Sequence, residues 1–498
     1  MIRILSVDNM RRSDAQTIAG GIPGRELMFR AGKGIFDRVD WKPPVAIVCG
    51  SGNNAGDGFV IAKLLHDAGI ACEIILLSEK ASEDGAYYLG LCRDAGVPVL
   101  TWDSTLSLQK YGTVADCIFG TGFRGAVQGT AREAIEAINA SGAFVVSADI
   151  NSGLNGDSGM AECCVRSDIT FAIGGWKPGH FLNMAKDVMK EKTNLDIGIE
   201  PVDRTYALAE ASDFADLFRP RPNFSHKGTY GYTALIGGSV KYSGAIRLAR
   251  MANAAMRSGA GVVKLAVPGV LYPVIAPSVL ESTLFPLGDD GEQITFSAQQ
   301  VDDLVSNVRT AAFGMGIGTG EGAFRTLEYL LDHFAGKLIV DADGLTLLSR
   351  MDRERIRSAS CALILTPHLK EFSRLSGLEI SEILNHPVTA AESYAKENGV
   401  ILLLKGPSTI ITDGESTWIT DAGCSGMATA GSGDVLSGIL SAVAAFAPDP
   451  LRGAAAAAYI NGRAGELAQR RMGSVSMTSG DTASCIPEIV RALETQAH

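Results

Sequence analysis

The sequence predicts two α/β domains in tandem, each built on a mostly parallel β-sheet. The chain has 498 residues, which is more than one typical core contains. From residue 45 to about residue 150, short apolar runs alternate with helix-like segments, as in β-α-β units. A second series of the same kind starts near residue 233. Because no repeat of about 20 to 50 residues is present, we expect tandem domains and not a repeat array.

The first series predicts five strands and the helices between them. We expect strands in VAIVCG (45–50), ACEIILLSE (71–79), VPVLTW (97–102), TVADCIFG (113–120) and AFVVSADI (143–150), and helices after Asp57, over 84–95 and near 130–140. Continuous apolar strands of this kind are buried on both faces. We therefore expect the N-terminal domain, residues 1–205, to have three layers, with helices on either side of one sheet.

The chain between residues 200 and 226, EPVDRTYALAEASDFADLFRPRPNFSH, interrupts this alternation. Its prolines and acidic residues predict a linker over residues 206–223. Beyond it, the runs TALIGG, GVVKLAVP, AAFGMGIG, KLIVDAD, ALILTPH, VILLLKG and TIITDG predict the strands of a C-terminal domain over residues 224–498. A helical region rich in small residues follows, from about 432 to 470.

Charge and composition argue against several classes of protein. The formal net charge is −11 and the pI is about 5.3, which disfavours nucleic acid or an anionic membrane as the main partner. The N-terminus lacks the apolar run of a signal peptide, and GILSAVAAFA is about half as long as a membrane span. Nine cysteines without CxxC or Cys/His ligand spacing predict free thiols. We expect a cytoplasmic homo-oligomer with no nucleic-acid or membrane partner.

Three loops of the first series follow strands, which is where parallel sheets bind their ligands. Residues 50–55, GSGNNA, fit the dinucleotide-binding pattern G-x-G-x-x-A. The second loop lies in DCIFGTGFRGAV, from Asp116, and the third, SADINSGLNG, contains Asp149 and Ser152. Asn and Asp in turns usually bond to their own backbone. Their occurrence at three successive strand ends favours a functional site.

The residue types in these loops suit three tasks. The side-chain oxygens of Asn54, Asp116 and Ser152 suit a monovalent or hard cation. The backbone amides of GTGFRGA, together with Arg124, suit a phosphate group. Asp149, at a strand end, is a candidate for proton transfer.

The stretches LMFRAG, GSGNNAGDG, DCIFGTGFRG and SADINSGL together resemble the NAD(P)H-hydrate epimerase family over about 200 residues. The resemblance implies a Rossmann-like domain in which Asn54, Asp116 and Ser152 bind potassium and Asp149 lies at the reacting ring. It places the hydrated dinucleotide against Asn53, Asn54, Ala55, Gly56, Asp57, Gly120, Thr121, Gly122, Phe123, Arg124, Gly125, Ala126 and Asp149. Two positions depart from the family pattern. We expect Ala55, which replaces a usual Gly, to crowd the phosphate slightly, and Asn151, which replaces a usual Pro, only to loosen a turn.

The stretch GMATAGSGDVLSGIL (426–440) carries the chemistry of the second half. Gly431, Ser432 and Gly433 enter a predicted helix, whose N-terminal amides make an anion hole for a transferring phosphoryl group. Asp434, in the first turn, is placed to remove a proton from a substrate hydroxyl. An Asp at this position is also ordinary helix stabilisation. The small-residue helix behind it favours the functional interpretation.

This segment resembles the ribokinase-like superfamily, and the lack of a Walker-type sequence agrees with that. With HKGTYGYTALIGGSVKYSGAIRLA, GMGIGTG, VDADGL, LTPHLKEFSRL and LLKGPSTII, the chain resembles the NAD(P)H-hydrate dehydratase family over about residues 224–495. The resemblance implies that Ala245, Gly318, His368 and Asp434 face the hydrate, and that Lys405, Gly406, Pro407, Ser408, Thr409 and Gly433 line an adenine nucleotide site. From the residues alone, His368 is equally a helix cap and Lys405 a solvated charge. VDADGL is either a turn or, through Asp341 or Asp343, a magnesium ligand.

Together the two resemblances imply repair of a damaged cofactor. Hydration at C6 of the nicotinamide ring turns NADH and NADPH into R and S hydrates, NADHX and NADPHX, which cannot transfer hydride. The first domain would interconvert the epimers with K⁺, and the second would dehydrate the S form with ADP, or ATP, and Mg²⁺. Three alternatives remain at this level: a vitamin-precursor kinase in the second half, a binding-only first half, or a dehydrogenase. The last would need a catalytic His or Lys, and no such constellation is evident in residues 1–200.

Overall fold

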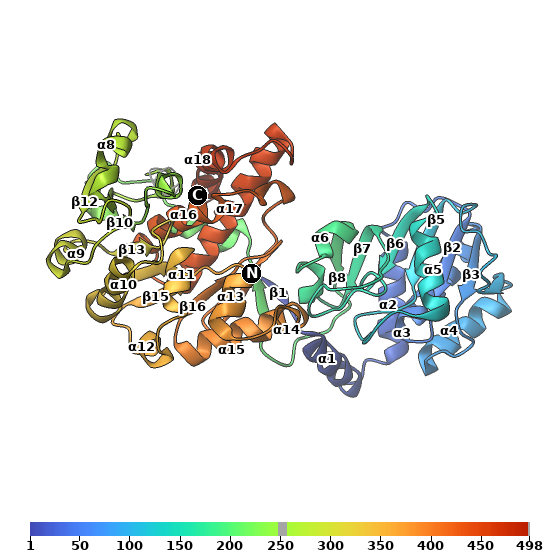
Figure 1. Ribbon diagram of the computed structural model, residues 1–498. Helices are drawn as coiled ribbons and strands as arrows, with labels where there is room; N and C mark the ends of the chain where they lie inside the picture. Colours follow the sequence, from blue (N-terminus) through green and yellow to red (C-terminus); the bar gives the residue numbers. More distant parts are fainter. Residues whose placement is uncertain (248–255, 497–498) are drawn as a thin grey trace. The chain divides into compact units, whose positions relative to one another are not determined.

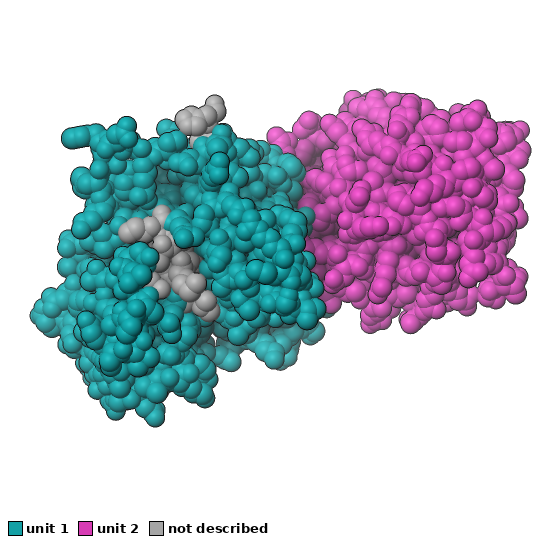
Figure 2. Space-filling model, turned by 90° about the horizontal axis from the view of Figure 1, so that it is seen from above, with its two compact units in different colours: residues 1–2, 207–498 teal, residues 3–206 magenta. Residues whose placement is uncertain are grey.

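The computed structural model describes residues 1–247 and 256–496 and divides into two compact units. We call Arg3–Tyr206 the first unit (magenta, labelled unit 2 in Figure 2) and Met1–Ile2 with Ala207–His498 the second unit (teal, labelled unit 1). Each unit has its own mostly parallel sheet, so the expected α/β fold class is confirmed. Among the helices of the described ranges, none is long and apolar enough to cross a membrane.

The first unit contains one sheet of seven parallel strands (Figure 1). In chain order the strands are β2 (Val45–Cys49), β3 (Cys72–Leu76), β4 (Val99–Thr101), β5 (Thr113–Cys117), β6 (Phe144–Ala148), β7 (Ser167–Ile173) and β8 (Met189–Leu195). The order across the sheet is β4-β3-β2-β5-β6-β7-β8. The chain therefore moves from β2 out to β4 and then returns to place β5 on the other side of β2.

Alternate side chains of β2 enter two separate cores, because successive residues of a strand point to opposite faces. Val45, Ile47 and Cys49 pack with α2 (Gly24–Phe36), α3 (Asn53–Asp67) and α4 (Glu83–Asp94). Ala46 and Val48 pack with α5 (Gly129–Asn139). The remaining helices of this unit are α1 (Val7–Ala19), α6 (Ala185–Val188) and the 3-10 turn η1 (Pro178–His180). The result is the three-layer arrangement that the sequence predicts.

The position between β2 and β5 is a topological switch point. The chain leaves β2 into α3 on one face of the sheet and leaves β5 toward α5 on the other. Loops that diverge in this way open a crevice outside the carboxyl ends of the two strands, where open α/β sheets bind ligands. The loops after β2 and β5 are two of the three that the sequence singles out.

The second unit has an eleven-stranded sheet in the order β1-β9-β18-β17-β16-β15-β14-β13-β10-β11-β12. Its strands are β1 (Ile2–Ile4), β9 (Tyr206–Leu208), β10 (Tyr232–Ile236), β11 (Val262–Pro268), β12 (Thr283–Leu287), β13 (Thr310–Phe313), β14 (Lys337–Val340), β15 (Ala362–Leu365), β16 (Ile401–Leu404), β17 (Thr409–Thr412) and β18 (Thr417–Thr420). The strands from β10 to β16 pair in parallel, whereas β17 pairs antiparallel with both β16 and β18.

The helices of the second unit supply most of its largest core. They are α8 (Tyr272–Ile275), α9 (Ala298–Val305), α10 (Glu321–His333), α11 (Asp343–Leu348), α12 (Arg353–Arg357), α13 (Leu369–Ser376), α14 (Ile380–Asn385), α15 (Pro387–Asn398), α16 (Ser432–Phe446), α17 (Pro450–Met472) and α18 (Ser479–Gln496). The apolar side chains of α16 pack between the sheet and the alanine-rich α17. Burial of α16 fixes its N-terminus, the GSGD turn, at the edge of the sheet.

Residues 206–223, expected as a linker, contribute structure to the second unit. Strand β9 pairs in parallel with β18. The ring of Phe214 is fully buried and lies 5.6 Å from Trp418 and 5.7 Å from Tyr459, measured between centroids. Phe218 is also buried, against Phe446. The prolines and acidic residues that predicted a linker thus flank apolar side chains that the core requires.

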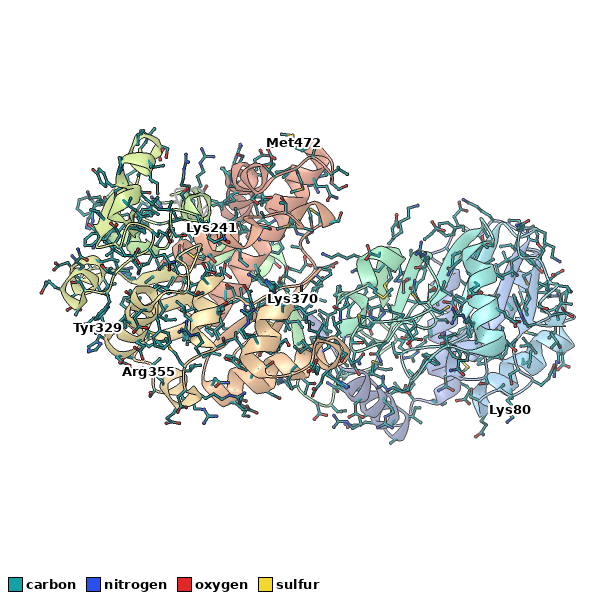
Figure 3. All side chains as sticks on the ribbon, in the orientation of Figure 1. Lys80, Lys241, Tyr329, Arg355, Lys370 and Met472 are labelled. Carbon is teal, nitrogen blue, oxygen red and sulfur yellow. The ribbon has the colours of Figure 1, made fainter. Side chains whose placement is uncertain are left out.

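Ion pairs on the surface add little to this framework. The guanidinium of Arg355 (Figure 3), for example, pairs with two carboxylates: Nη1 lies 2.6 Å from Glu328 Oε1, and Nη2 lies 2.7 Å from Asp332 Oδ2. Water and salt screen such exposed pairs, which contribute about 0–1 kcal/mol each. The stability of both units therefore rests on their buried cores.

Candidate functional site

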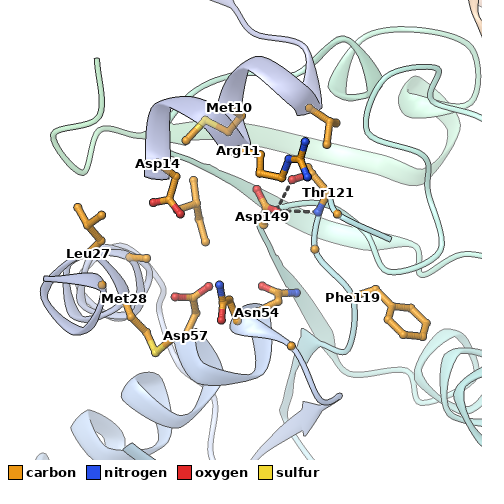
Figure 4. A pocket seen from close by; sticks show the side chains of 18 of the residues that line it. Met10, Arg11, Asp14, Leu27, Met28, Asn54, Asp57, Phe119, Thr121 and Asp149 are labelled. Carbon is orange, nitrogen blue, oxygen red and sulfur yellow. Dashed lines mark hydrogen bonds between the residues drawn. The ribbon is translucent and has the colours of Figure 1, made fainter. Parts of the chain in front are cut away.

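A cavity of about 480 Å³ opens at the switch point between β2 and β5 (Figure 4). Its walls come from α1, α2, the first turn of α3, the loop after β5 and the ends of β6 and β7. A cavity of this size suits part of a dinucleotide. The sequence-predicted residues that line it are Asn53, Asn54, Asp57, Gly120, Thr121, Gly122, Phe123 and Asp149.

Asp149 follows β6 directly and is held from two sides. Its φ of 62° is a strained value for a residue with a side chain. Its Oδ2 accepts hydrogen bonds from the backbone N and Oγ1 of Thr121, at 2.7 and 2.8 Å, and its Oδ1 accepts one from Lys177 Nζ at 2.8 Å. Burial disfavours the charged form, but the Lys177 ammonium and these hydrogen bonds outweigh it, so the pKa of Asp149 is lowered. Asp149 is therefore an anchored carboxylate.

Lys177 and His180, which the sequence did not single out, hold Asp149 in place. The Lys177 side chain is 1% exposed and also donates to the carbonyl of Ile173 at 2.7 Å. His180 Nε2 donates to the backbone carbonyl of Asp149 at 2.8 Å, and burial lowers the pKa of His180 to about 4, so its ring is neutral. Both side chains position Asp149, which differs from the catalytic His or Lys with a second substrate pocket that a dehydrogenase would need. The available signal was WKPGH, a fourth polar loop after a strand.

Asn54 and Asp57 point from the start of α3 into the same cavity (Figure 4). Asn54 is 6% exposed, and neither Oδ1 nor Nδ2 finds a hydrogen-bond partner among the described residues. Asp57 is 8% exposed. Burial, and then the negative charges of Asp149 and Asp14, raise the pKa of Asp57 well above its ordinary value. Because a buried polar group without a partner is costly, the amide of Asn54 indicates a ligand, and Asp57 lines the same cavity.

Asp116 and Ser152 lie behind the cavity wall, fully buried and bonded to each other. Asp116 Oδ2 also accepts from the backbone N of Ser152 and from Ser147 Oγ, both at 2.9 Å. Ser152 Oγ accepts from the backbone N of Phe119 at 2.8 Å. Of the three oxygen ligands expected for a cation, only Asn54 is thus unpaired in the described part of the chain. Nowhere among the described residues do three or more His, Cys, Asp or Glu side chains form a cluster that could hold a metal ion.

The other residues expected at this site lie outside the cavity lining. Ala55 is fully buried and belongs to the core, so it does not crowd the cavity as expected. Gly56 lies where a Cβ would collide with Met28. Residues 124–126 are exposed, and Arg124 lies 3.6 Å from Asp157.

Asn151 fastens the loop after β6 and does not loosen it. The residue is fully buried, and its Nδ2 donates to the carbonyls of Val165 and Val188, each at 2.9 Å. Its Oδ1 accepts from Thr170 Oγ1 at 2.5 Å. The expectation of a looser turn was wrong, because the amide side chain of Asn151 forms hydrogen bonds that replace the backbone restraint of a proline.

The second constellation lies at the N-terminus of α16. Gly431 has a φ of 86°, which a glycine adopts freely, and the helix begins at Ser432. The backbone N–H groups of Gly433 and Asp434 find no acceptor within the described ranges, as expected for the first turn of a helix. Burial and the charge of Asp341 raise the pKa of Asp434 to about 6, against the opposing effect of Lys405. Such a carboxyl is matched to proton removal near neutral pH.

Lys405 lies beside this helix N-terminus and is not a solvated charge. Its Nζ donates to Asp341 Oδ1 at 3.0 Å, and Ser437 Oγ donates to Asp341 Oδ2 at 2.7 Å. A Cβ at Gly433 would lie 3.2 Å from Lys405 Nζ, so the glycine permits this approach. The structure therefore brings Gly433, Asp434 and Lys405 together, with Asp341 as the counter-charge.

The remaining residues expected in the second unit follow β10, β13, β15 and β16. His368 caps α13, since its Nδ1 accepts hydrogen bonds from the backbone N of Lys370 at 3.1 Å and of Glu371 at 3.3 Å. The backbone of His368 also pairs with that of Lys405 in an isolated parallel β-bridge. The backbone N of Gly318 donates to Asp343 Oδ2 at 2.9 Å. Ala245 packs partly buried against the core, Gly406 and Pro407 are exposed, Ser408 is buried and Thr409 begins β17.

These two sites define a class: a two-domain α/β protein with a switch-point cavity in one unit and an anion-binding helix N-terminus in the other. A family model described as NAD(P)H-hydrate dehydratase matches residues 233–488, and one described as YjeF-related protein N-terminus matches residues 24–179. The bifunctional NAD(P)H-hydrate repair enzyme of Pyrobaculum aerophilum is 33% identical over 95% of both chains. That of Archaeoglobus fulgidus is 33% identical, over 98% of this chain and 99% of its own. The chain belongs to the family of bifunctional NAD(P)H-hydrate repair enzymes.

A solved structure supports the fold of the second unit. The ADP/ATP-dependent NAD(P)H-hydrate dehydratase of Bacillus subtilis, co-crystallized with ATP and Mg²⁺, is 26% identical. It matches with a TM-score of 0.51, over 58% of this chain and 99% of that one. The comparisons favour the dehydratase over the small-molecule kinase that the anion hole alone left open.

Proposed function

We propose that this chain repairs hydrated NADH and NADPH. The first unit interconverts the R and S epimers at C6, and the second dehydrates the S epimer with ADP or ATP as co-substrate. The observation that carries this proposal is the contrast between two carboxyls. The Asp149 carboxylate is anchored in a cavity of about 480 Å³ that suits part of a dinucleotide, whereas Asp434 has a pKa of about 6 and lies beside helix amides that have no acceptor in the described ranges.

In the second unit, Asp434 removes the proton of the C6 hydroxyl, whose oxygen attacks the terminal phosphoryl group of the nucleotide. The amides of Gly433 and Asp434, with the Lys405 ammonium, stabilise the charge that develops there. The phosphate then leaves with the electrons of the C6–O bond, pushed by the lone pair of the ring nitrogen, and loss of a proton from C5 to solvent or phosphate forms the C5=C6 double bond of NAD(P)H. The nucleotide lies against Lys405, Gly406, Pro407, Ser408, Thr409 and Gly433, and the hydrate against Ala245, Gly318, His368 and Asp434.

Two cations accompany this proposal. Asp343 offers carboxylate oxygens of the kind that bind Mg²⁺, which would neutralise nucleotide phosphates when bound, whereas Asp341 is already paired with Lys405 and Ser437. In the first unit the buried, unpaired Oδ1 of Asn54 fits a potassium ligand, and Asp116 and Ser152 would complete the site. Potassium would order the loops after β2 and β5.

We further propose a cytoplasmic homo-oligomer. All nine cysteines are free thiols, which fits a reducing compartment. Val270, Tyr272, Val274 and Leu280 expose apolar side chains that a second copy of the chain would cover. Light scattering should then give a mass that is a multiple of 52.3 kDa.

The full chain tests the proposal directly. We would supply mixed R and S hydrates with ADP, Mg²⁺ and K⁺, follow both epimers by chromatography and subtract the spontaneous rates. Both epimers should return to NAD(P)H. Asp434→Asn should stop dehydration but keep epimer exchange, and Asp149→Asn should leave the R epimer behind as S is consumed. A wild-type chain that consumes neither epimer would refute the proposal.

A further inference from the structure

We propose that Asp57 is the proton donor of the epimerisation, acting across the cavity from the Asp149 carboxylate. This inference rests on the proposed epimerase function of the first unit. It assigns opposite roles to two aspartates of one site.

The placement of Asp57 is the first argument. It lies on α3, on the opposite side of the cavity from Asp149, and both line it (Figure 4). Its carboxyl finds no hydrogen-bond donor among the described residues, although it is 8% exposed. On the same helix turn, the amide of Asn54 is 6% exposed and equally without a partner. The unpaired amide of Asn54, beside Asp57 in the cavity lining, indicates that a ligand binds in this space.

The partners of the two aspartates are the second argument. The buried ammonium of Lys177 is bonded to Asp149 Oδ1 at 2.8 Å, and in the described ranges no Lys, Arg or His forms an ion pair with Asp57. The groups that face Asp57 are the carboxyls of Asp149 and Asp14, the more distant Lys177 and the buried thiol of Cys117. Burial and the two carboxylates raise the pKa of Asp57, whereas the pKa of Asp149 is lowered. When the environments of two neighbouring carboxyls shift their pKa values in opposite directions, one carboxyl acts as the acid and the other as the base.

The chemistry of the C6 hydrate requires such a pair. Asp57 gives its proton to the C6 hydroxyl oxygen, and the C6–O bond breaks, with both electrons leaving on water. The lone pair of N1 forms a C6=N1 double bond, and the Asp149 carboxylate stabilises the resulting cation. A water then adds to the other face of C6, the π electrons return to N1, and the surplus proton passes to Asp149. Proton exchange with solvent restores the resting charges.

The test uses the full chain with purified R hydrate, K⁺ and no nucleotide, in water enriched in ¹⁸O. Chromatography and mass spectrometry follow the S epimer and its oxygen label. Asp57→Asn should lower the epimerisation rate by about 10²–10⁴-fold, the usual contribution of a general acid. The matched control is Asp67→Asn, which removes an exposed carboxylate from the same helix, outside the cavity, and should leave the rate unchanged.

A second measurement on wild type keeps the inference testable if Asp57→Asn does not fold. The wild-type rate, corrected for the spontaneous reaction, should fall as pH rises through the raised pKa of Asp57, since only the protonated carboxyl donates. Each S product should carry one ¹⁸O atom, because the C6–O bond breaks.

Three results would overturn the donor role: a folded Asp57→Asn variant with the wild-type rate, a wild-type rate that does not fall with pH, or an S product without the label. A wild-type chain that never exceeds the spontaneous rate would instead overturn the proposed epimerase function itself. The two failures are therefore distinguishable.

Discussion

Replacing Lys177 by Met should destabilise the first unit by about 3–5 kcal/mol at neutral pH, because it leaves the Asp149 carboxylate buried without a counter-charge. The substitution keeps most of the length of the side chain and removes the ammonium group with its charge and its hydrogen bonds. Lys177 is 1% exposed and the Asp149 side chain 15% exposed, so water cannot take over the role of the ammonium.

The size of this predicted loss of stability follows from the distance between the two charges. Two unit charges 2.8 Å apart attract each other by about 6 kcal/mol at an effective dielectric constant of about 20. The cost of burying the ammonium offsets part of this attraction in wild type, whereas the variant retains the cost of burying the carboxylate. The carbonyl of Ile173 also loses its donor at 2.7 Å.

The loss should depend on pH in a defined direction. In wild type the pKa of Asp149 is lowered in the folded state, so its contribution to stability is present above the ordinary value of 3.8 and is lost as pH falls through the folded pKa. Without Lys177, burial dominates and raises the pKa of Asp149. The variant then loses stability as pH rises above about 4, and the gap between the two proteins widens toward neutrality.

Urea denaturation of the full chain, followed by tryptophan fluorescence, measures this effect. Three of the four tryptophans, Trp41, Trp102 and Trp176, lie in the first unit and report its transition. Lys63→Met is the control, since it removes a solvent-accessible pair with Asp67 and should cost at most about 1 kcal/mol.

A double variant isolates the buried charge. Lys177→Met combined with Asp149→Asn should recover most of the lost stability, because no charge then remains buried. If Lys177→Met costs no more than Lys63→Met, or if the second substitution restores nothing, the assignment of a buried ion pair is refuted.

Two further predictions concern buried hydrogen bonds and proton removal. Asn151→Ala should cost about 2–4 kcal/mol in the same urea assay, since it strands two carbonyls and a hydroxyl in the interior; a cost below about 1 kcal/mol would contradict the network. The dehydration rate should rise as pH increases through about 6, where Asp434 ionises. Asp341→Asn should move that rise to lower pH, because it removes a neighbouring negative charge, and an unmoved profile would speak against Asp434 as the base.

The sequence located the main strands and three of the loops at the site, because these features are local. Apolar runs such as VAIVCG and TVADCIFG read as buried strands, and β2 and β5 lie there. Strands β7 and β8 were not among the five strands predicted for this unit. Strand β8 forms the sheet edge, and its residues MKEKTNL leave charged side chains exposed, so it lacks a continuous apolar run. Residues 206–223 were predicted to be a linker because prolines and acidic residues surround their apolar side chains, although Phe214 is fully buried.

The sequence predicted only some of the residues that line the cavity of the first unit, because only some of them stand in a recognisable local pattern. Asn54 and Asp57 stand in a glycine-rich turn that the pattern singles out, whereas Lys177 stands in a loop with no such pattern. Its partner Asp149 lies 28 residues away in the sequence, and only the parallel order of β6 and β7 brings the two together.

The sequence by itself determined two α/β domains, the polar loops at their strand ends, and the GSGD turn at the start of a helix, since periodicity and turn chemistry are properties of neighbouring residues. Only the tertiary structure decided the direction in which the pKa of each aspartate is shifted. Asp57, Asp149 and Asp434 have the same side chain, but burial and the partners that distant segments bring within a few ångströms give each a different pKa. That difference supports the roles of proton donor, anchored anion and base that we propose for them.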